Sequence, residues 1–131
     1  MHDEHVITGL ILDDCTIISS LYEVIMESPM LNLIKKNSNI QAYQALDNFT
    51  ENQIQIDFII TDIFRYTRKN DSPSGVLFFD EIAENKKWNN GPIDLINIPK
   101  LIITGNGMEY AKRLVAEYPL TDLLKKPPDF H

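Results

Sequence analysis

The feature that most constrains the fold of this chain is a set of short apolar segments, each of which ends at polar side chains. Residues 58–61 have the sequence Phe-Ile-Ile-Thr and run directly into Asp62. Residues 6–12 and 100–104 are similarly apolar and are closed or followed by polar residues. Short apolar runs of this kind are typical of strands buried on both faces of a parallel sheet. The sequence therefore predicts a sheet with at least three buried strands.

Segments with helical spacing of apolar residues alternate with these strands. Helices are expected over residues 15–27, 44–52, 76–88 and 108–118. Residues 30–36 are expected to add a further helical turn or two. Strands are expected over residues 6–12, 39–43, 56–62, 100–104 and 121–126. This alternation predicts one α/β domain, residues 1–131, in which a five-stranded parallel sheet is doubly wound, with helices on both faces.

Composition narrows the classes of partner that the chain can have. It carries 12 basic and 19 acidic residues, a net charge of −7. An acidic chain is unsuited to direct nucleic-acid binding and to binding an anionic membrane surface. No apolar run approaches the roughly 18 residues of a membrane span, and the first residues lack the basic start of a secretory signal. With a single cysteine, Cys15, the sequence fits a reducing compartment, and we expect a cytoplasmic location.

The predicted fold would bring several reactive side chains to one edge of the sheet. Asp13 and Asp14, Asp62, and Thr104 all stand at the carboxyl ends of predicted strands, where parallel α/β proteins bind their ligands. Carboxylates gathered there repel one another unless a cation compensates, and hard oxygen ligands suit Mg²⁺. Lys126, at the end of the last strand, adds a positive charge. This set of groups is equipped for phosphoryl transfer with a carboxylate as the nucleophile.

Four of these segments carry a resemblance to a known family. They are Leu-Ile-Leu-Asp-Asp at residues 10–14, Asp-Phe-Ile-Ile-Thr-Asp at 57–62, Leu-Ile-Ile-Thr at 101–104 and Leu-Leu-Lys-Lys-Pro-Pro at 123–128. With these four segments in this order, the sequence resembles the receiver domain of bacterial two-component response regulators, and the resemblance extends over residues 6–128. The resemblance implies a flavodoxin-like sheet with the strand order 2-1-3-4-5.

The resemblance also implies a role for each residue of the predicted edge. Asp62 would accept a phosphoryl group from a histidine kinase or a histidine phosphotransfer protein. Thr104 would hydrogen-bond that group and Lys126 would pair with it. The implied Mg²⁺ ligands are the side chains of Asp13, Asp14 and Asp62 and the backbone carbonyl of Phe64. The domain would then be a switch that changes the binding of a downstream protein target, and not an enzyme beyond its own phosphorylation and dephosphorylation.

The sequence departs from the family at three informative places. Residues 63–75 are expected to form a polar loop, interrupted by Pro73 and Gly75, that is longer than usual for the family. Leu123 stands where many members carry an aromatic residue that couples to the threonine. The family follows its lysine-proline turn with a fifth helix, whereas this sequence ends at residue 131, so we expect that helix to be missing or truncated. Apolar sheet surface would then need a cover, and a dimer mate, a partner protein or further chain could supply it. Residues 30–36 are a local candidate for part of that cover.

Two other functions are alternatives to the phosphorylated switch. One is a pseudo-receiver, a protein-interaction module that keeps the fold without the phosphoryl cycle; the complete acid set argues against it, and the altered loop after Asp62 argues for it. The other is a phosphatase of the haloacid dehalogenase type, which needs an acid two positions after its nucleophile. Cys15 follows Asp13 at that spacing and Phe64 follows Asp62, so the sequence excludes the phosphatase.

Overall fold

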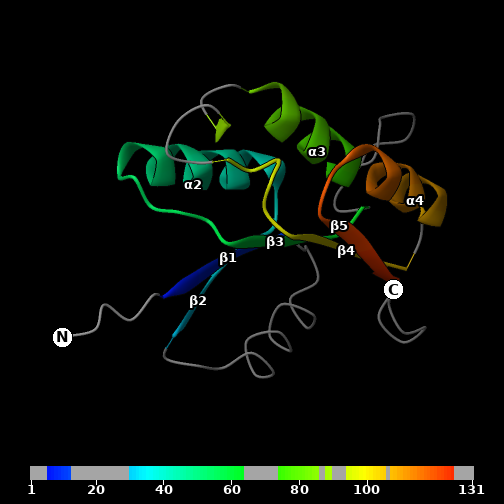
Figure 1. Ribbon diagram of the computed structural model, residues 1–131, viewed down its shortest axis with the longest axis horizontal. Helices are drawn as coiled ribbons and strands as arrows, with labels where there is room; N and C mark the ends of the chain where they lie inside the picture. The colour runs from blue at the N-terminus through cyan, green and yellow to red at the C-terminus, as the bar shows by residue number, and fades with distance from the viewer. Residues whose placement is uncertain are drawn as a thin grey trace.

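The structure, a computed structural model, describes residues 6–12, 30–63, 74–85, 88–89, 94–105 and 107–125. Its strands are β1 (Ile7–Leu12), β2 (Leu31–Lys36), β3 (Phe58–Thr61), β4 (Lys100–Thr104) and β5 (Thr121–Lys125). Its helices are α2 (Asn39–Glu51), α3 (Ser74–Glu84) and α4 (Met108–Glu117), and Figure 1 shows their arrangement. None of the helices in the described part of the chain is long and apolar enough to cross a membrane.

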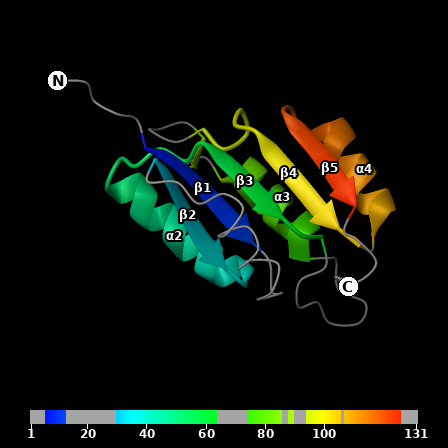
Figure 2. The same ribbon diagram turned by 90° about the horizontal axis from the view of Figure 1, so that it is seen from below.

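The five strands form one sheet in the order β2-β1-β3-β4-β5, and every neighbouring pair is parallel (Figure 2). The predicted sheet and its strand order are therefore confirmed. In the centre of the sheet, Thr61 lies level with Leu12 on β1 and with Ile102 on β4. The central strands β1, β3 and β4 are the three apolar segments of the sequence, and each is largely buried. Their carboxyl ends meet at one edge.

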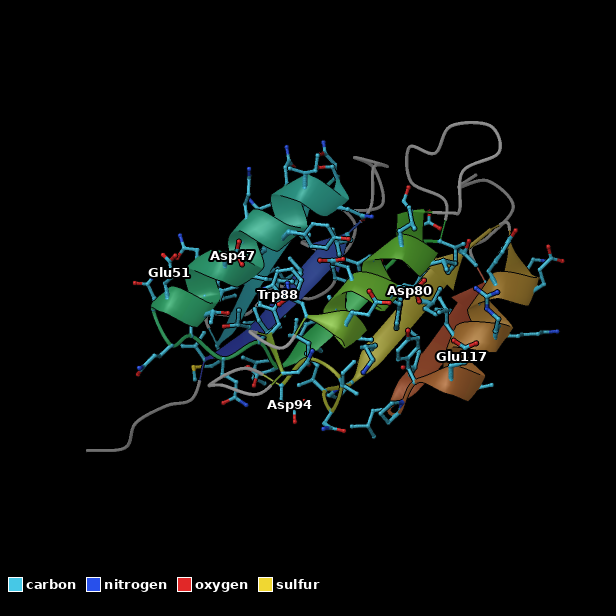
Figure 3. The ribbon with its side chains drawn as sticks, turned by 90° about the horizontal axis from the view of Figure 1, so that it is seen from above. Asp47, Glu51, Asp80, Trp88, Asp94 and Glu117 are labelled. Atoms are coloured by element: carbon cyan, nitrogen blue, oxygen red, sulfur yellow. The ribbon has the colours of Figure 1, made fainter. Side chains whose placement is uncertain are left out.

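The three described helices all cover the same face of the sheet (Figure 1). The main core lies beneath them and joins alternate strand residues to the apolar sides of the helices; its members include Leu10, Leu12, Ile59, Ile102, Leu46, Phe78, Phe79, Ile82 and Leu114. Trp88 is a member of this core, 1% exposed, and its ring stacks on Tyr43. Its indole N–H donates to Asp47 Oδ1 at 3.2 Å, and Figure 3 labels both residues. The helix expected over residues 15–27 lies outside the described residues.

The opposite face of the sheet carries a smaller apolar cluster. Ile11, Ile60 and Ile103 are its buried members, and partly buried Leu33, Phe58 and Leu101 pack against them. Leu124, beside Ile103 on β5, is 56% exposed. The expectation of a missing fifth helix falls on residues 126–131, outside the described part of the chain, so the covering partner stays a prediction.

The second strand and the following helix differ from the sequence-based prediction. Residues 39–43 are not a strand but the first turns of α2, and residues 30–36 are not helical but supply β2, so they are not part of a cover. The Ser38 hydroxyl accepts from Gln41 N–H at 3.2 Å, which caps the helix and starts it at Asn39. The preceding segment pairs with β1 along all six of its residues. Apolar residues in so short a segment fit both helical and strand spacing, and pairing with β1 decides between them.

The remaining boundaries shift by a few residues. The loop predicted to extend to Gly75 is shorter at that end, because α3 already begins at Ser74. In α3, Phe79 and Ile82 face the core, whereas Ala83 is exposed. Both α4 and β5 lie where the periodicity places them.

Candidate functional site at the carboxyl edge of the sheet

Asp62 immediately follows β3 and is held by backbone groups on both sides. Its N–H donates to the carbonyl of Leu12, the last residue of β1, at 3.1 Å. Its carboxylate oxygen Oδ1 accepts from the N–H of the next residue, Ile63, at 2.7 Å. The residue is only 6% exposed. A carboxylate at the end of a central strand, buried and oriented by a backbone amide, is an unusual and specific placement for an acid.

Thr104 is the last residue of β4 and is fully buried. In the register of the sheet, Thr61 on β3 lies level with Ile102 on β4. Asp62 therefore comes one position beyond that level and Thr104 two positions beyond it, on adjacent parallel strands. The structure thus places both residues at the carboxyl edge. On the other side of Thr104, Lys125 ends β5.

The other predicted site residues lie outside the described part of the chain: Asp13, Asp14, Phe64 and Lys126. The described residues that precede two of them, Leu12 and Lys125, are strand ends at this same edge. The structure brings together Asp62 and Thr104, and the roles of all six residues stay predictions.

Comparison with known proteins finds similarity at the level of structure. No family model matches the sequence, and no curated protein is similar to it. Among solved structures, a response regulator receiver domain protein from Clostridium thermocellum superposes with a TM-score of 0.67 at 24% identity, covering 92% of this chain and 82% of the other. The chemotaxis response regulator CheY4 of Vibrio cholerae also gives 0.67, at 16% identity over 93% and 88% of the two chains. This chain has the receiver-domain fold.

A receiver domain from another kingdom has the same arrangement. The receiver domain of the histidine kinase CKI1 from Arabidopsis thaliana gives a TM-score of 0.64 at 15% identity, covering 93% of this chain and 82% of that one. At such identities the likeness establishes the fold, while function has to come from the site itself.

The site of this receiver fold suits a divalent cation in its chemistry. Among the described residues there is no group of three or more potential metal-ligating side chains. Asp62 nevertheless supplies a hard oxygen donor, and Mg²⁺ commonly takes one or two carboxylates from a protein and keeps several waters. Asp62 therefore fits as one ligand, and the sequence-predicted partners are Asp13, Asp14 and the carbonyl of Phe64.

Sequence reasoning missed the glycine that packs against the acid. Gly75, in the first turn of α3, is buried and donates its N–H to the carbonyl of Ile63 at 2.8 Å. The two ends of the long connection after Asp62 are thereby joined. In the sequence, Gly75 is marked only by its place just before an apolar run with helical spacing, and that place predicts a loop residue.

A second buried polar group lies at the amino edge of the same sheet. Lys100, the first residue of β4, is 2% exposed, and its ammonium donates to the carbonyls of Ile96 at 2.7 Å and Ile98 at 2.8 Å, with Leu95 at 3.4 Å. Burial lowers the pKa of Lys100 to about 8, against a smaller raising effect of nearby Asp94. This lysine lies at the opposite end of β4 from Thr104, and its hydrogen bonds hold the connection that precedes β4 in place.

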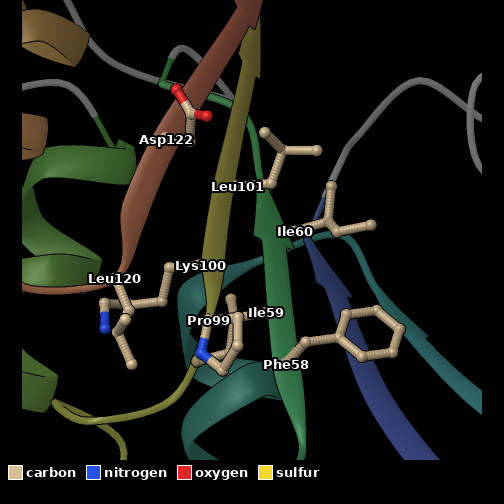
Figure 4. A pocket seen from close by; sticks show the side chains of 8 residues that line it. All are labelled: Phe58, Ile59, Ile60, Pro99, Lys100, Leu101, Leu120 and Asp122. Atoms are coloured by element: carbon tan, nitrogen blue, oxygen red, sulfur yellow. The ribbon is translucent and has the colours of Figure 1, made fainter.

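A hollow on the face of the sheet opposite the three described helices also lies outside the candidate site. It has a volume of about 340 Å³ and is lined mainly by apolar side chains near the starts of β3 and β4, among them Phe58, Ile60, Leu101 and Leu120 (Figure 4). The hollow does not contain Asp62 or Thr104. The candidate receiver site is therefore the carboxyl edge and not this hollow.

Proposed function

We propose that the chain is a phosphoacceptor receiver domain in two-component, or phosphorelay, signalling. It takes a phosphoryl group from a histidine kinase or a histidine phosphotransfer protein onto Asp62. The observation that carries this proposal is the placement of Asp62: it is buried at the end of the central strand β3 of a receiver fold, with one oxygen held by the Ile63 amide.

In the proposed reaction, a carboxylate oxygen of Asp62 attacks the phosphorus of a phosphohistidine. The P–N bond breaks, the imidazole leaves and takes up a proton, and Asp62 becomes an acyl phosphate. The Thr104 hydroxyl and the Lys126 ammonium stabilise the oxygens of the transferred group. Asp13, Asp14, Asp62 and the carbonyl of Phe64 would hold a Mg²⁺ ion, which when bound would supply positive charge to offset the repulsion between the phosphoryl group and the carboxylates of this edge.

The product would act as a switch rather than as an enzyme on other substrates. An acyl phosphate at the carboxyl edge changes the charge and the contacts of the segments that meet there, and so changes the affinity for a downstream protein target. The acidic net charge favours protein partners over direct contact with nucleic acid or membrane. We place this cycle in the cytoplasm.

Intact mass measurement tests the proposal directly. The protein is mixed with Mg²⁺ and acetyl phosphate, beside Asp62→Asn and a matched control, Asp122→Asn, on the exposed strand β5. We expect one added phosphoryl group in the wild type and in Asp122→Asn, and none in Asp62→Asn. If no form gains mass with acetyl phosphate or with a phosphorylated histidine phosphotransfer protein, the phosphoacceptor function is wrong, and a phosphorylation-independent interaction module becomes the better reading.

A further inference from the structure

One oxygen of the Asp62 carboxylate is held by the peptide unit that links Asp62 to Ile63. The carbonyl of this unit belongs to Asp62 and accepts from the Thr61 hydroxyl at 3.0 Å. The N–H of the same unit donates to Asp62 Oδ1 at 2.7 Å. Because a peptide unit is planar and rigid, a rotation that moves its carbonyl also moves its N–H. The direction of the carboxylate is therefore tied to the position of that carbonyl.

Gly75 lies directly against this peptide unit. A Cβ atom on Gly75 would overlap the carbonyl oxygen of Asp62, and it would stand 2.7 Å from the Cα and 3.1 Å from the carbonyl oxygen of Ile63. All three neighbours are backbone atoms, so no flexible side chain can move aside. The Ile63 side chain is fully buried in the main core, which fixes the other side of the contact.

The conformation of Gly75 does not itself require a glycine. It is a residue of α3, and its φ angle is not in the left-handed region. Inside a helix alanine is intrinsically favoured over glycine. The close approach to the peptide unit of Asp62 and Ile63 is therefore the reason that position 75 has no side chain.

The first turn of α3 is held in turn by α2. The side-chain amide of Asn39, the first residue of α2, donates to the carbonyl of Ser74 at 3.0 Å. Asn39 thus keeps Ser74 and Gly75 close to the end of β3. A series of short contacts leads from the start of α2 to the carboxylate at the carboxyl edge.

We propose that Gly75 is a positioning residue for the phosphoacceptor, acting through the peptide unit between Asp62 and Ile63. This inference rests on the proposed function. A side chain at position 75 rotates that unit, displaces the Ile63 amide from Oδ1 and turns the carboxylate away from the line of attack on phosphorus. Misplacement of a reacting group by about 1 Å can lower a rate on the order of 100-fold.

The test compares Gly75→Ala with Leu77→Ala, a truncation of an exposed residue in the same helix. Initial rates of phosphorylation are measured over a range of acetyl phosphate concentrations at saturating Mg²⁺. We expect the maximal rate of Gly75→Ala to fall at least about tenfold, a loss of the size that misplaced reacting groups produce, with Leu77→Ala unchanged. The amide proton resonance of Ile63 should move in Gly75→Ala alone. Equal maximal rates and an unmoved Ile63 resonance would overturn the inference.

A second variant guards against a simple loss of folding. If Gly75→Ala does not fold, Asn39→Ala removes the side-chain hydrogen bond to the Ser74 carbonyl without adding an atom, and it should lower the maximal rate several-fold and shift the Ile63 resonance. An unchanged rate and resonance in Asn39→Ala would then overturn the inference. A wild-type protein that accepts no phosphoryl group refutes the proposed function instead, and the Ile63 resonance still tests the positioning.

Discussion

Replacing Lys100 by methionine tests whether a buried ammonium fastens the connection before β4. Methionine keeps an unbranched side chain and removes the three donated hydrogen bonds. The carbonyls of Ile96 and Ile98, at 2.7 and 2.8 Å, lose the stronger bonds, while the bond to Leu95 is longer at 3.4 Å. A buried carbonyl that loses its hydrogen-bond donor lowers the stability of the fold by about 1–3 kcal/mol. Part of this loss is offset, because the substitution also removes a charge that is costly to bury. We expect Lys100→Met to lower the free energy of unfolding by roughly 2–3 kcal/mol near neutral pH.

The same residue gives the wild type a distinctive dependence on pH. Burial lowers the pKa of Lys100 to about 8 in the folded protein, from the 10.5 that is ordinary for a lysine. Between these values the unfolded chain binds more protons, so the contribution of Lys100 to stability rises with pH. A pKa shift of this size corresponds to roughly 3 kcal/mol of unfolding free energy. The backbone carbonyls that accept from the ammonium favour its charged form, so the change in stability should be smaller than this value. The stability difference between wild type and Lys100→Met should therefore widen from about pH 8 to about pH 10.

Urea unfolding followed by the fluorescence of Trp88, the single tryptophan, measures both effects. Other groups titrate in both proteins, so their contributions cancel in the difference. Lys112→Met, an exposed change on α4, is the control and should stay within about 0.5 kcal/mol of the wild type. Equal stability of Lys100→Met and wild type, or a difference that narrows as pH rises from 8, would refute the reasoning.

Three further predictions concern the proposed site and two side-chain contacts in the structure. Thr104→Ala should slow phosphorylation of the folded protein by about tenfold or more, while Thr104→Ser retains the rate, as kinetics with acetyl phosphate would show. Tyr118→Phe loses the hydroxyl bond to Asp80 at 3.1 Å and should cost about 1 kcal/mol in urea unfolding. Because burial and Asp80 raise the pKa of Tyr118 to about 12, the unfolded chain ionises first and this difference should shrink above about pH 10. A side chain on Gly9 would overlap the ring of Phe58, so Gly9→Ala should destabilise the protein by about 1–3 kcal/mol, and a double-mutant cycle with Phe58→Leu should be non-additive.

The sheet could be predicted from the sequence because its central strands are buried on both faces. Residues 58–61 and 100–104 are apolar runs too short for a helix and bounded by polar residues, and that pattern has one good structural solution. The edge strand β2 was harder, since residues 31–36 mix apolar and polar residues at spacings that fit either structure. Only pairing with β1, a contact distant in sequence, decides it.

In the same way, some polar or close-packed residues could be predicted from the sequence and others could not. Asp62 and Thr104 could be found because each ends an apolar strand, and the topology of parallel sheets then fixes their edge. Gly75 could not be found, because its role depends on which backbone atoms α3 meets after a long connection. Lys100 could not be found either: a lysine at the start of a strand is usually solvated, and only the folded connection supplies the carbonyls that receive its ammonium.

The two polar sites are separated by the length of β4, and this separation allows stability and signalling to be tested independently. Lys100 begins the strand and Thr104 ends it, so their Cα atoms lie about 13 Å apart at the usual rise of a strand. The ammonium of Lys100 donates to backbone carbonyls of the connection at the amino edge, so its hydrogen bonds lie at the opposite end of β4 from Thr104. Lys100→Met should consequently be less stable yet be phosphorylated at the wild-type rate under conditions where it is folded. A loss of phosphorylation in parallel with stability would instead mean that the connection before β4 helps to position Thr104, and the carboxyl edge would have to be regarded as part of one cooperative unit with the amino edge.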